Sequence, residues 1–264
     1  MYCAGIDAGS RAIKILLIDT DSLEIIASGV ADQGKEHDSL SRELFERILK
    51  DNGLKREDIS RIVATGYARN NVSISDTTIT EITCHARGVS HVVPDAKTVI
   101  EIGGQDSKVL RLDGQGAVRD FAMNDRCAAG TGRFLEVVAA HLGVELQELG
   151  EMRSRSLKPA AISSMCVVFA ETEIFGLLAS GTAPEDIVAG IQAAVAARVC
   201  ALVGRNITAP IIFTGGVAMI SGMADALESV FGQPVSTAPD PQMTGALGAA
   251  ILACRQRRDG VDTL

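Results

Sequence analysis

The stretch "GIDAGSRAIKILLID", residues 5–19, has the pattern of two β-strands joined by a glycine turn. Apolar residues alternate on both sides of Gly9, which predicts strands over residues 2–8 and 12–19. The segment "EIIASGVAD", residues 24–32, shows the same alternation after a further break. The chain is therefore expected to open with a three-stranded antiparallel meander.

The same pattern returns in the middle of the chain. "KTVIEIGGQDSKVLRLD", residues 97–113, again combines a strand, a glycine turn and a strand, and "AVRDFAM", residues 117–123, supplies a third strand. Each meander also carries an acidic residue close to its glycine turn. This repetition indicates two copies of one fold, joined near residues 94–97.

Helical spacing of apolar residues predicts the elements that cover these sheets. The first helix is expected over residues 39–53, where Gly53 ends it. A strand is expected within "APIIFTGG", residues 209–216. Further helices are expected over residues 133–142, 167–179, 184–203 and 221–230.

The last helical pattern, "GALGAAILACRQRR", residues 245–258, is not followed by a strand. It is therefore expected to cross back and cap the first half of the chain. The predicted organisation is a first subdomain over residues 1–96, a second over residues 97–240, and a C-terminal segment, residues 241–264, packed on the first.

Composition and charge narrow the class of protein. The chain has 264 residues, of which 47% are hydrophobic and 22% charged, as in a globular protein with one large or two modest domains. Its formal net charge of -8 leaves no basic surplus to neutralise phosphates, which argues against nucleic acid or an anionic membrane as a partner. The sequence shows neither a leader pattern nor a run of about 18 apolar residues, so a cytoplasmic protein is expected.

Three glycine turns, in residues 5–14, 102–108 and 213–218, fit the backbone of phosphate-binding loops. Glycine lets the backbone approach a phosphate and point successive N–H groups at the anion. Asp7 and Asp106, beside the first two turns, are suited to hold Mg²⁺ through water and to align an attacking water molecule. One such turn alone is more often a simple hairpin, so the argument rests on all three.

These three turns, the duplicated meander and the returning last helix resemble the nucleotide-binding signature of actin, sugar kinases and heat-shock chaperone ATPases. The resemblance implies an α/β, two-domain actin-like ATPase fold with a duplicated ribonuclease H-like motif. In that fold each domain supplies one phosphate loop for ATP, and the second also supplies an adenosine loop. The sequence contains neither the G-x-x-x-x-G-K-[ST] motif of P-loop enzymes nor a G-x-G-x-x-G after its first strand.

The six cysteines include no Cys-x-x-Cys pair, and in a reducing compartment they are expected as free thiols or metal ligands. Cys200 and Cys254 lie within apolar helices and Cys3 lies within a strand, so these three are expected to fill the core. Cys84 has the polar neighbour His85. Whether Cys84 belongs to the core or serves the site is open at this point.

Cys127 and Cys166 each precede an apolar, helix-like run, and each is expected to begin a helix. The start of a helix has unpaired N–H groups and partial positive charge, both of which stabilise a thiolate. Thiolates are the ligands of iron–sulfur clusters, and a cubane cluster needs four of them. A homodimer with its twofold axis through the cluster supplies two thiolates from each subunit.

Eight stretches closely resemble the activator ATPases of 2-hydroxyacyl-CoA dehydratases and the related ATPase subunits of benzoyl-CoA reductases. They are "GIDAGSRAIKILLID", "ATGYARN", "EITCHARG", "VIEIGGQDSKV", "MNDRCAAGTGRFLE", "ISSMCVVFAETE", "FTGGVA" and "TGALGAAILA". The resemblance runs from about Gly5 to Ala253. Its most specific element is "NDRCAAGTGRFLE", residues 124–136.

The resemblance implies a homodimer that carries one oxygen-sensitive 4Fe-4S cluster on Cys127 and Cys166 and hydrolyses ATP with Mg²⁺. Members of the family take an electron from ferredoxin or flavodoxin and drive it into an iron–sulfur partner that reduces a CoA ester. For this chain we expect a reductive activator of an (R)-2-hydroxyacyl-CoA dehydratase. The alternatives are an ATPase subunit of a benzoyl-CoA reductase or related CoA-ester reductase, a small-molecule kinase of the same fold, and a non-catalytic actin-like or chaperone-like binding module.

The resemblance also assigns residues to the nucleotide. The first phosphate loop corresponds to Gly9, Ser10, Arg11, Ala12, Ile13 and Lys14. The second corresponds to Gly103, Gly104, Gln105 and Asp106, and the nucleotide loop to Gly215 and Gly216, with Gln242 near the base or ribose. Catalytic roles are expected for Asp7, Gln105 and Asp106. Arg11 and Ile13 depart from the small or hydroxyl residues common in relatives, so contacts at those two positions are expected through the backbone.

Overall fold

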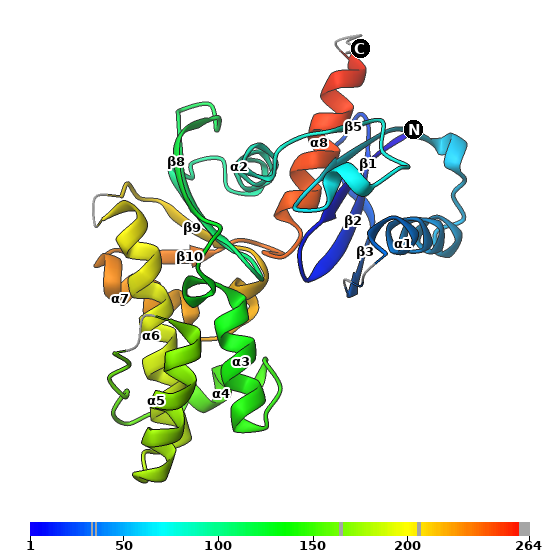
Figure 1. Cartoon of the computed structure of the whole chain (residues 1–264). Coiled ribbons are helices and arrows are strands. Elements are labelled where there is room, and N and C mark those ends of the chain that lie inside the picture. Colours follow the sequence, from blue (N-terminus) through cyan, green and yellow to red (C-terminus); the bar gives the residue numbers. More distant parts are fainter. Residues whose placement is uncertain (33, 35, 164–165, 205–206, 259–264) are drawn as a thin grey trace. The chain divides into compact units, whose positions relative to one another are not determined.

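The chain divides into two compact units in the computed structural model (Figure 1). Unit 1 comprises Met1–Asp95, Asp113–Val118 and Gln242–Leu264, and unit 2 comprises Ala96–Leu112 and Arg119–Pro241. The structure describes residues 1–32, 34, 36–163, 166–204 and 207–258. The last six residues of the predicted C-terminal segment, 259–264, lie outside the described residues.

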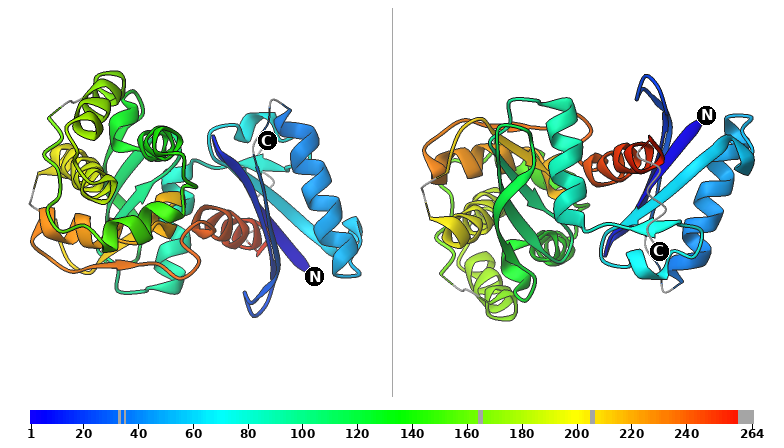
Figure 2. Two further views of the ribbon diagram at one scale, coloured as in Figure 1. Left: turned by 90° about the horizontal axis from the view of Figure 1, so that it is seen from below. Right: turned by 90° about the horizontal axis from the view of Figure 1, so that it is seen from above.

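Unit 1 is built on a five-stranded sheet in the order β3-β2-β1-β4-β5. The predicted opening meander is confirmed by three strands that pair antiparallel, β1 (Tyr2–Ala8), β2 (Ala12–Asp19) and β3 (Ile25–Asp32). Parallel pairing extends the sheet through β4 (Ile59–Thr65) and β5 (Thr77–Thr78). Helix α1 (His37–Asp51) packs on one face and α8 (Thr244–Arg258) on the other (Figure 2).

Helix α2 (Glu81–Val92), which sequence patterns did not predict, packs against α8 at two glycines, Gly88 and Gly248. A Cβ atom at Gly248 would collide with the backbone oxygen of Cys84, and one at Gly88 would collide with that of Thr244. The two helices can approach this closely because neither residue carries a Cβ. This contact holds α8, including its first turn, against the rest of unit 1.

Unit 2 contains a second five-stranded sheet, in the order β10-β9-β6-β7-β8. The second predicted meander is confirmed by β6 (Thr98–Ile102), β7 (Ser107–Leu112) and β8 (Val118–Asn124), of which β6 and β7 pair antiparallel. On the other side of β6, parallel pairing adds β9 (Ile211–Thr214) and β10 (Val235–Thr237). The duplicated pattern in the sequence thus corresponds to two sheets of like order.

The helices of unit 2 bury one apolar core against this sheet. All four predicted helices are present, as α3 (Gly132–Leu142), α5 (Val167–Ala179), α6 (Pro184–Val203) and α7 (Met223–Phe231), and the short α4 (Glu148–Ser154) is additional. Helices α3, α5 and α6 pack side by side (Figure 1). Short 3-10 turns lie at Arg56–Asp58, Arg69–Asn71, Ala128–Gly130 and Gly216–Met219.

Helix α6 is long and apolar enough to cross a membrane by length and composition alone. In unit 2, however, 56% of its most apolar stretch is buried against other elements. Residues such as Ile187, Ile191 and Val195 are fully buried in the core. The helix is therefore the central core helix of unit 2.

Candidate functional site

The first phosphate loop lies between β1 and β2 in unit 1. The N–H of Gly9 donates to the carbonyl oxygen of Ala12 at 3.1 Å, which closes the turn. Asp7, only 4% exposed, lies opposite Lys14 in the strand register. The Lys14 Nζ is 3.0 Å from Asp7 Oδ2, so a largely buried ion pair flanks the turn.

The other residues assigned to this loop lie in different environments. Ile13 is fully buried in the core beneath α1, and Ala12 is buried as well. Ser10 is half-buried and Arg11 is exposed, while Gln242 is half-buried elsewhere in the same unit. A ligand at this turn would therefore meet the backbone of Ala12 and Ile13 rather than their side chains.

Three further residues of unit 1 lie near Asp7, and sequence reasoning did not assign them a role. His85 is 5% exposed, and its Nδ1 is 2.9 Å from the hydroxyl oxygen of Thr244. A Cβ atom at Gly245 would lie 3.1 Å from Asp7 Oδ2 and 3.2 Å from His85 Nε2. The start of α8 thus brings the imidazole and the carboxylate together on the Cβ side of one glycine.

Cys84, whose role the sequence left open, is fully buried in a core cluster formed by α8 and by strands β1, β2 and β4. Burial raises the pKa of its thiol to about 12. The thiol therefore stays protonated at neutral pH and does not provide the thiolate that a metal requires. Cys84 is a core residue beside the first phosphate loop.

The second phosphate loop, between β6 and β7 in unit 2, has a similar turn. The N–H of Gly103 donates to the carbonyl oxygen of Asp106 at 3.0 Å. Lys108 is fully buried, and its Nζ lies 2.9 Å from Glu101 Oε2 and 2.7 Å from Asp106 Oδ2. Gln105 is exposed on the turn. One buried ammonium group therefore holds two carboxylates at this loop.

The strand register shows which acid of the second loop corresponds to Asp7. Glu101 lies opposite Lys108 across β6 and β7, as Asp7 lies opposite Lys14 across β1 and β2. The two members of each pair are 7 residues apart. Sequence reasoning missed Glu101 and Lys108, and this repeated spacing is the signal that would have found them.

The third glycine turn follows β9. Gly215 adopts a φ of 91°, and its N–H donates to the carbonyl oxygen of Pro241 at 2.9 Å. The hydroxyl of Thr214 donates to the same oxygen at 2.6 Å. A Cβ atom at Gly215 would lie 2.8 Å from Glu101 Oε1, so the third turn adjoins the second phosphate loop. Gly216 is exposed beyond it.

The second phosphate loop is also hydrogen-bonded to the start of α3. The N–H of Gly132 donates to the carbonyl oxygen of Gly103 at 2.9 Å, and the N–H of Arg133 donates to that of Gly104 at 2.8 Å. The first N–H groups of a helix have no acceptor within the helix. Here the loop supplies two of the acceptors that the helix lacks.

Cys127 is exposed, but it does not begin α3 as predicted. It precedes the 3-10 turn Ala128–Gly130, and α3 starts only after Thr131. The physical reason is that Thr131 is the N-cap, because its hydroxyl oxygen accepts a hydrogen bond from the N–H of Arg133 at 3.3 Å. The sequence pattern predicted a helix shortly after Cys127, but it did not identify Thr131 as the residue that caps this helix.

Asn124, the last residue of β8, holds the Cys127 backbone at both ends. Its Oδ1 accepts from the Cys127 N–H at 3.0 Å, and its Nδ2 donates to the Cys127 carbonyl oxygen at 2.7 Å. Burial lowers the pKa of the guanidinium group of Arg198 on α6. Arg198 also lies close enough to Cys127 for an electrostatic interaction, a smaller effect that raises this pKa. The thiol is thus exposed while its backbone is fixed.

Cys166 is also exposed, and it occupies the N-cap position of α5, so the prediction that it begins a helix is confirmed. Glu173 of α5 accepts hydrogen bonds from the N–H and the hydroxyl of Ser163, each at 2.8 Å. The first turn of α5 exposes Val168 and Phe169, at 67% and 69%. An exposed thiol and exposed apolar side chains therefore lie together at this helix start.

The remaining cysteines are buried, namely Cys3, Cys84, Cys200 and Cys254. The expectation that Cys3, Cys200 and Cys254 fill the core is confirmed. Within the described part of the chain, no three His, Cys, Asp or Glu side chains are grouped so that they can hold a metal ion. Cys127 and Cys166 thus do not form a complete metal site with other described residues.

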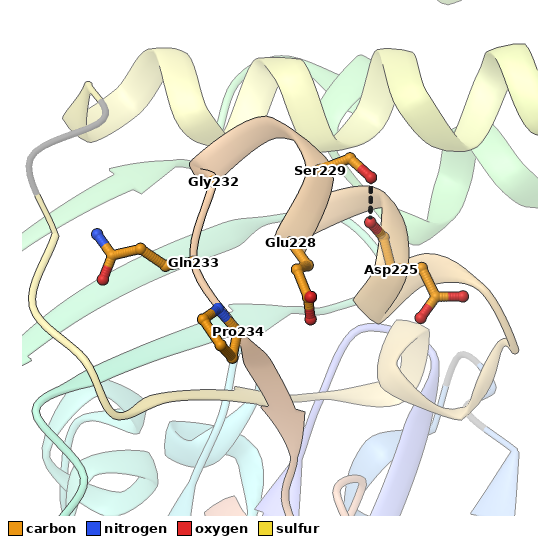
Figure 3. A pocket seen from close by; sticks show the side chains of 6 residues that line it. All are labelled: Asp225, Glu228, Ser229, Gly232, Gln233 and Pro234. Carbon is orange, nitrogen blue, oxygen red and sulfur yellow. Dashed lines mark hydrogen bonds between the residues drawn. The ribbon is translucent and has the colours of Figure 1, made fainter.

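A surface pocket of about 520 Å³ lies in unit 2 around the end of α7 (Figure 3). Two acidic residues, Asp225 and Glu228, lie on its helical side, and Gln233 and Pro234 lie opposite (Figure 3). None of the residues assigned to the nucleotide lines it. This pocket is therefore separate from the three glycine turns.

A sequence model of the BadF/BadG/BcrA/BcrD ATPase family matches residues 4–253 of the chain. The protein named activator of lactoyl-CoA dehydratase from Anaerotignum propionicum is 45% identical, over 96% of this chain and 97% of its own length. One of the subunits of the benzoyl-CoA reductase from Thauera aromatica is more distant, at 31% identity over 94% of this chain and 91% of its own length.

Two solved structures have the same fold over almost their whole length. The activator of the 2-hydroxyisocaproyl-CoA dehydratase from Clostridium difficile, with bound ADPNP, is 41% identical with a TM-score of 0.92, covering 100% of this chain and 99% of its own. Component A of the (R)-2-hydroxyglutaryl-CoA dehydratase from Acidaminococcus fermentans is 42% identical with a TM-score of 0.93, covering 98% and 99%. The predicted α/β actin-like ATPase fold is thereby confirmed.

Proposed function

Because the chain belongs to the BadF/BadG/BcrA/BcrD ATPase family, we propose that it is the ATP-dependent reductive activator of an iron–sulfur (R)-2-hydroxyacyl-CoA dehydratase. One observation carries the proposal. Unit 2 exposes two thiols, and the loop of one of them leads into a helix that is hydrogen-bonded to the second phosphate loop. This arrangement joins nucleotide chemistry to electron transfer, which a small-molecule kinase does not need.

The two phosphate loops supply the nucleotide chemistry. Backbone N–H groups of the glycine turns would face the phosphates. Asp7 beside the first loop, and Asp106 and Glu101 beside the second, are carboxylates suited to hold Mg²⁺ through water. The exposed Gln105 would align the attacking water on the γ-phosphorus. Attack forms the new P–O bond and breaks the bond to the β-phosphate oxygen, so that ADP and phosphate leave. Gly215 and Gly216 would face the nucleoside, with Gln242 near the base or ribose.

The donor set fits an iron–sulfur cluster shared by two subunits. Cys127 and Cys166 are the two exposed cysteines of the described chain, and both belong to unit 2. Two sulfurs from each subunit make the four thiolates of a 4Fe-4S cluster. Such a cluster carries one electron at low potential when it is bound.

The surroundings of these thiols support a homodimer. Val168 and Phe169 follow Cys166 on the first turn of α5, and both are exposed. Phe121 and Met123 lie on β8 ahead of Cys127 and are exposed at 49% and 37%. Apolar side chains exposed beside both proposed ligands are what a subunit interface requires.

The proposal extends to the partners and the setting. A ferredoxin or flavodoxin is the one-electron donor, and the dehydratase is the acceptor. Reduced thiols and an oxygen-sensitive cluster are consistent with the cytoplasm of an anaerobically growing cell. ATP turnover would then drive the electron toward a more reducing acceptor.

The test is a cysteine substitution under strictly anoxic conditions. Wild-type protein is expected to be brown, and Cys166→Ala is expected to lose the visible absorption and the iron while still binding ADP. Cys200→Ala, which changes a buried core cysteine, is the matched control and should keep the cluster. A colourless, iron-free wild type, or a full cluster in Cys166→Ala, would refute the proposal.

A second candidate function rests on the benzoyl-CoA reductase component among the relatives. In that case the chain would serve as the ATPase component of a CoA-ester reductase. Anoxic pull-down with the tagged chain distinguishes the two. A stably associated multi-subunit reductase would favour the second candidate, whereas a dehydratase that associates only with nucleotide would favour the first.

A further inference from the structure

The contact between the second phosphate loop and the Cys127 loop lies wholly within unit 2. We propose that Gly132 and Asn124 are positioning residues that transmit a nucleotide-dependent movement of the loop Gly103–Gly104 to the Cys127 sulfur. This inference rests on the proposed function, since it assumes that Cys127 binds a cluster. It adds the route by which the nucleotide acts on that cluster.

The first step of the route is the pair of hydrogen bonds at the start of α3. The Gly132 and Arg133 N–H groups donate to the Gly103 and Gly104 carbonyl oxygens at 2.9 Å and 2.8 Å. A loop that shifts by an ångström either breaks both bonds or takes the first turn of α3 with it. Breaking them leaves the buried Gly132 N–H without this acceptor, and leaves the Arg133 N–H with the Thr131 hydroxyl alone. Joint movement is therefore favoured.

The second step is the close approach at Gly132, which is buried. A Cβ atom at this position would lie 3.0 Å from the Gly103 oxygen and 3.1 Å from Cγ2 of Val217. Val217 belongs to the third glycine turn. The second phosphate loop and the third glycine turn therefore both contact α3 at Gly132. Glycine at this position keeps both contacts short, and an added Cβ would require α3, the loop or the Val217 side chain to shift by a few tenths of an ångström.

The third step runs from α3 back to the sulfur. The N–H and the hydroxyl of Thr131 both donate to the Ala128 carbonyl oxygen, at 3.1 Å and 2.8 Å. At the other end Asn124 holds the Cys127 N–H and carbonyl oxygen with its single amide group. A Cβ atom at Gly130 would lie 3.5 Å from Asn124 Nδ2, so the turn packs against this amide. The chain from Cys127 to α3 is thus braced at both ends.

This bracing has a thermodynamic consequence. If the nucleotide changes the affinity of the protein for an electron, then reduction changes the affinity for the nucleotide by the same factor. The ratio of the ADP dissociation constants of oxidised and reduced protein therefore reports the coupling, without any measurement of dehydratase activation. A tenfold ratio corresponds to about 59 mV in a one-electron potential.

The experiment measures ADP binding to oxidised and to dithionite-reduced protein, with iron content determined on the same samples. Wild type is expected to show a ratio of about 5- to 150-fold. Gly132→Ala and Asn124→Ala should each reduce the ratio to about twofold or less while retaining iron. Gly114→Ala is the matched control, because a Cβ at Gly114 meets no atom within 4 Å, and it should keep the wild-type ratio.

The outcomes separate this inference from the proposed function. An iron-free wild type would refute the proposed function itself. A brown wild type whose ratio survives unchanged in both Gly132→Ala and Asn124→Ala would overturn the route and leave the proposed function standing. If Gly132→Ala loses ADP binding altogether, Asn124→Ala decides, because its substitution leaves the phosphate loop untouched. A ratio retained in that variant would overturn the proposal.

Discussion

At the scale of single residues, the two phosphate loops share an acid–lysine pair but differ in how completely it is buried. Lys14 is 14% exposed and contacts the carboxylate of Asp7. The Lys108 side chain is 1% exposed and contacts both Glu101 and Asp106. Because water cannot replace the ammonium group at the second loop, its removal leaves two neighbouring carboxylates without their cation.

Substitution of this lysine tests that difference. Lys108→Met is expected to lower the free energy of unfolding by about 3–5 kcal/mol, as for other buried ion pairs that lose one partner. Lys14→Met, with a more exposed lysine and one carboxylate contact, should cost less. Urea denaturation of both variants checks the order. Equal or reversed losses would mean that burial of the ammonium group does not control this site.

Cys84 allows a prediction about pH. Its thiol has a pKa of about 12 in the folded protein, above the ordinary value of 9.0. Between these values the unfolded chain loses the proton and the folded chain keeps it, so stability falls as pH rises, by at most about 1.4 kcal/mol per pH unit. The stability of Cys84→Ala should fall less steeply above pH 9 than that of wild type. If the stabilities of wild type and Cys84→Ala, measured by thermal unfolding, fall equally with pH in this range, the raised pKa of Cys84 is contradicted.

At the scale of elements, close helix contacts depend on glycines whose neighbours are backbone atoms. At Gly248 the nearest atom to an added Cβ is the carbonyl oxygen of Cys84, which belongs to the backbone of α2. A backbone oxygen cannot rotate away as the end of a long side chain can. The distance between α2 and α8 is therefore set by this residue.

Gly248→Ala is expected to force the two helices apart and to cost about 1–3 kcal/mol of stability, as overpacking of a core does. Gly176→Ala in α5 is the control, because a Cβ at this exposed position meets no atom within 4 Å. The control should be neutral or stabilising by up to about 1 kcal/mol, since alanine favours a helix. If both variants unfold at the same temperature, the contact at Gly248 is looser than described.

At the scale of the whole molecule, the two units divide the proposed work. Each carries a glycine turn with an acid–lysine pair, but the exposed thiols belong to unit 2. The proposed electron-transfer chemistry is therefore assigned to the copy of the fold that also has the helices α3 and α5. Since one chain offers two exposed thiols in its described part, the proposed four-thiolate centre would take the other two from a second copy.

Mass and iron content check this stoichiometry. Anoxic protein is expected to elute as a species of about twice the 27.7 kDa chain mass, with about two iron atoms per chain. Removal of iron by a chelator should destabilise the dimer, because the four thiolates no longer share a centre. A brown monomer with four iron atoms would contradict the shared site.

Most of the regular structure was predictable because it depends on local patterns. Helical spacing along α1 reflects the one face that this helix buries, whereas β1, β2 and α6 are recognisable as apolar runs because they are buried on nearly all sides. Helix α2 was missed because its buried face includes His85 and Gly88, which are not typical core residues, and because its burial depends on tertiary contact with α8. The start of α3 was predicted to within one residue, but the cap of this helix is Thr131 and not Cys127, which was expected to begin a helix.

The sequence by itself determined the duplicated meander, the three glycine turns and the two candidate cysteines, since each is written in residues that are adjacent or regularly spaced. Only the tertiary structure decided that Glu101 corresponds to Asp7, because strand register is set by pairing between chain segments. It also decided that Gly132 contacts the loop at Gly103, about 30 residues earlier in the chain. Such contacts arise from packing of whole elements, and no local pattern records them.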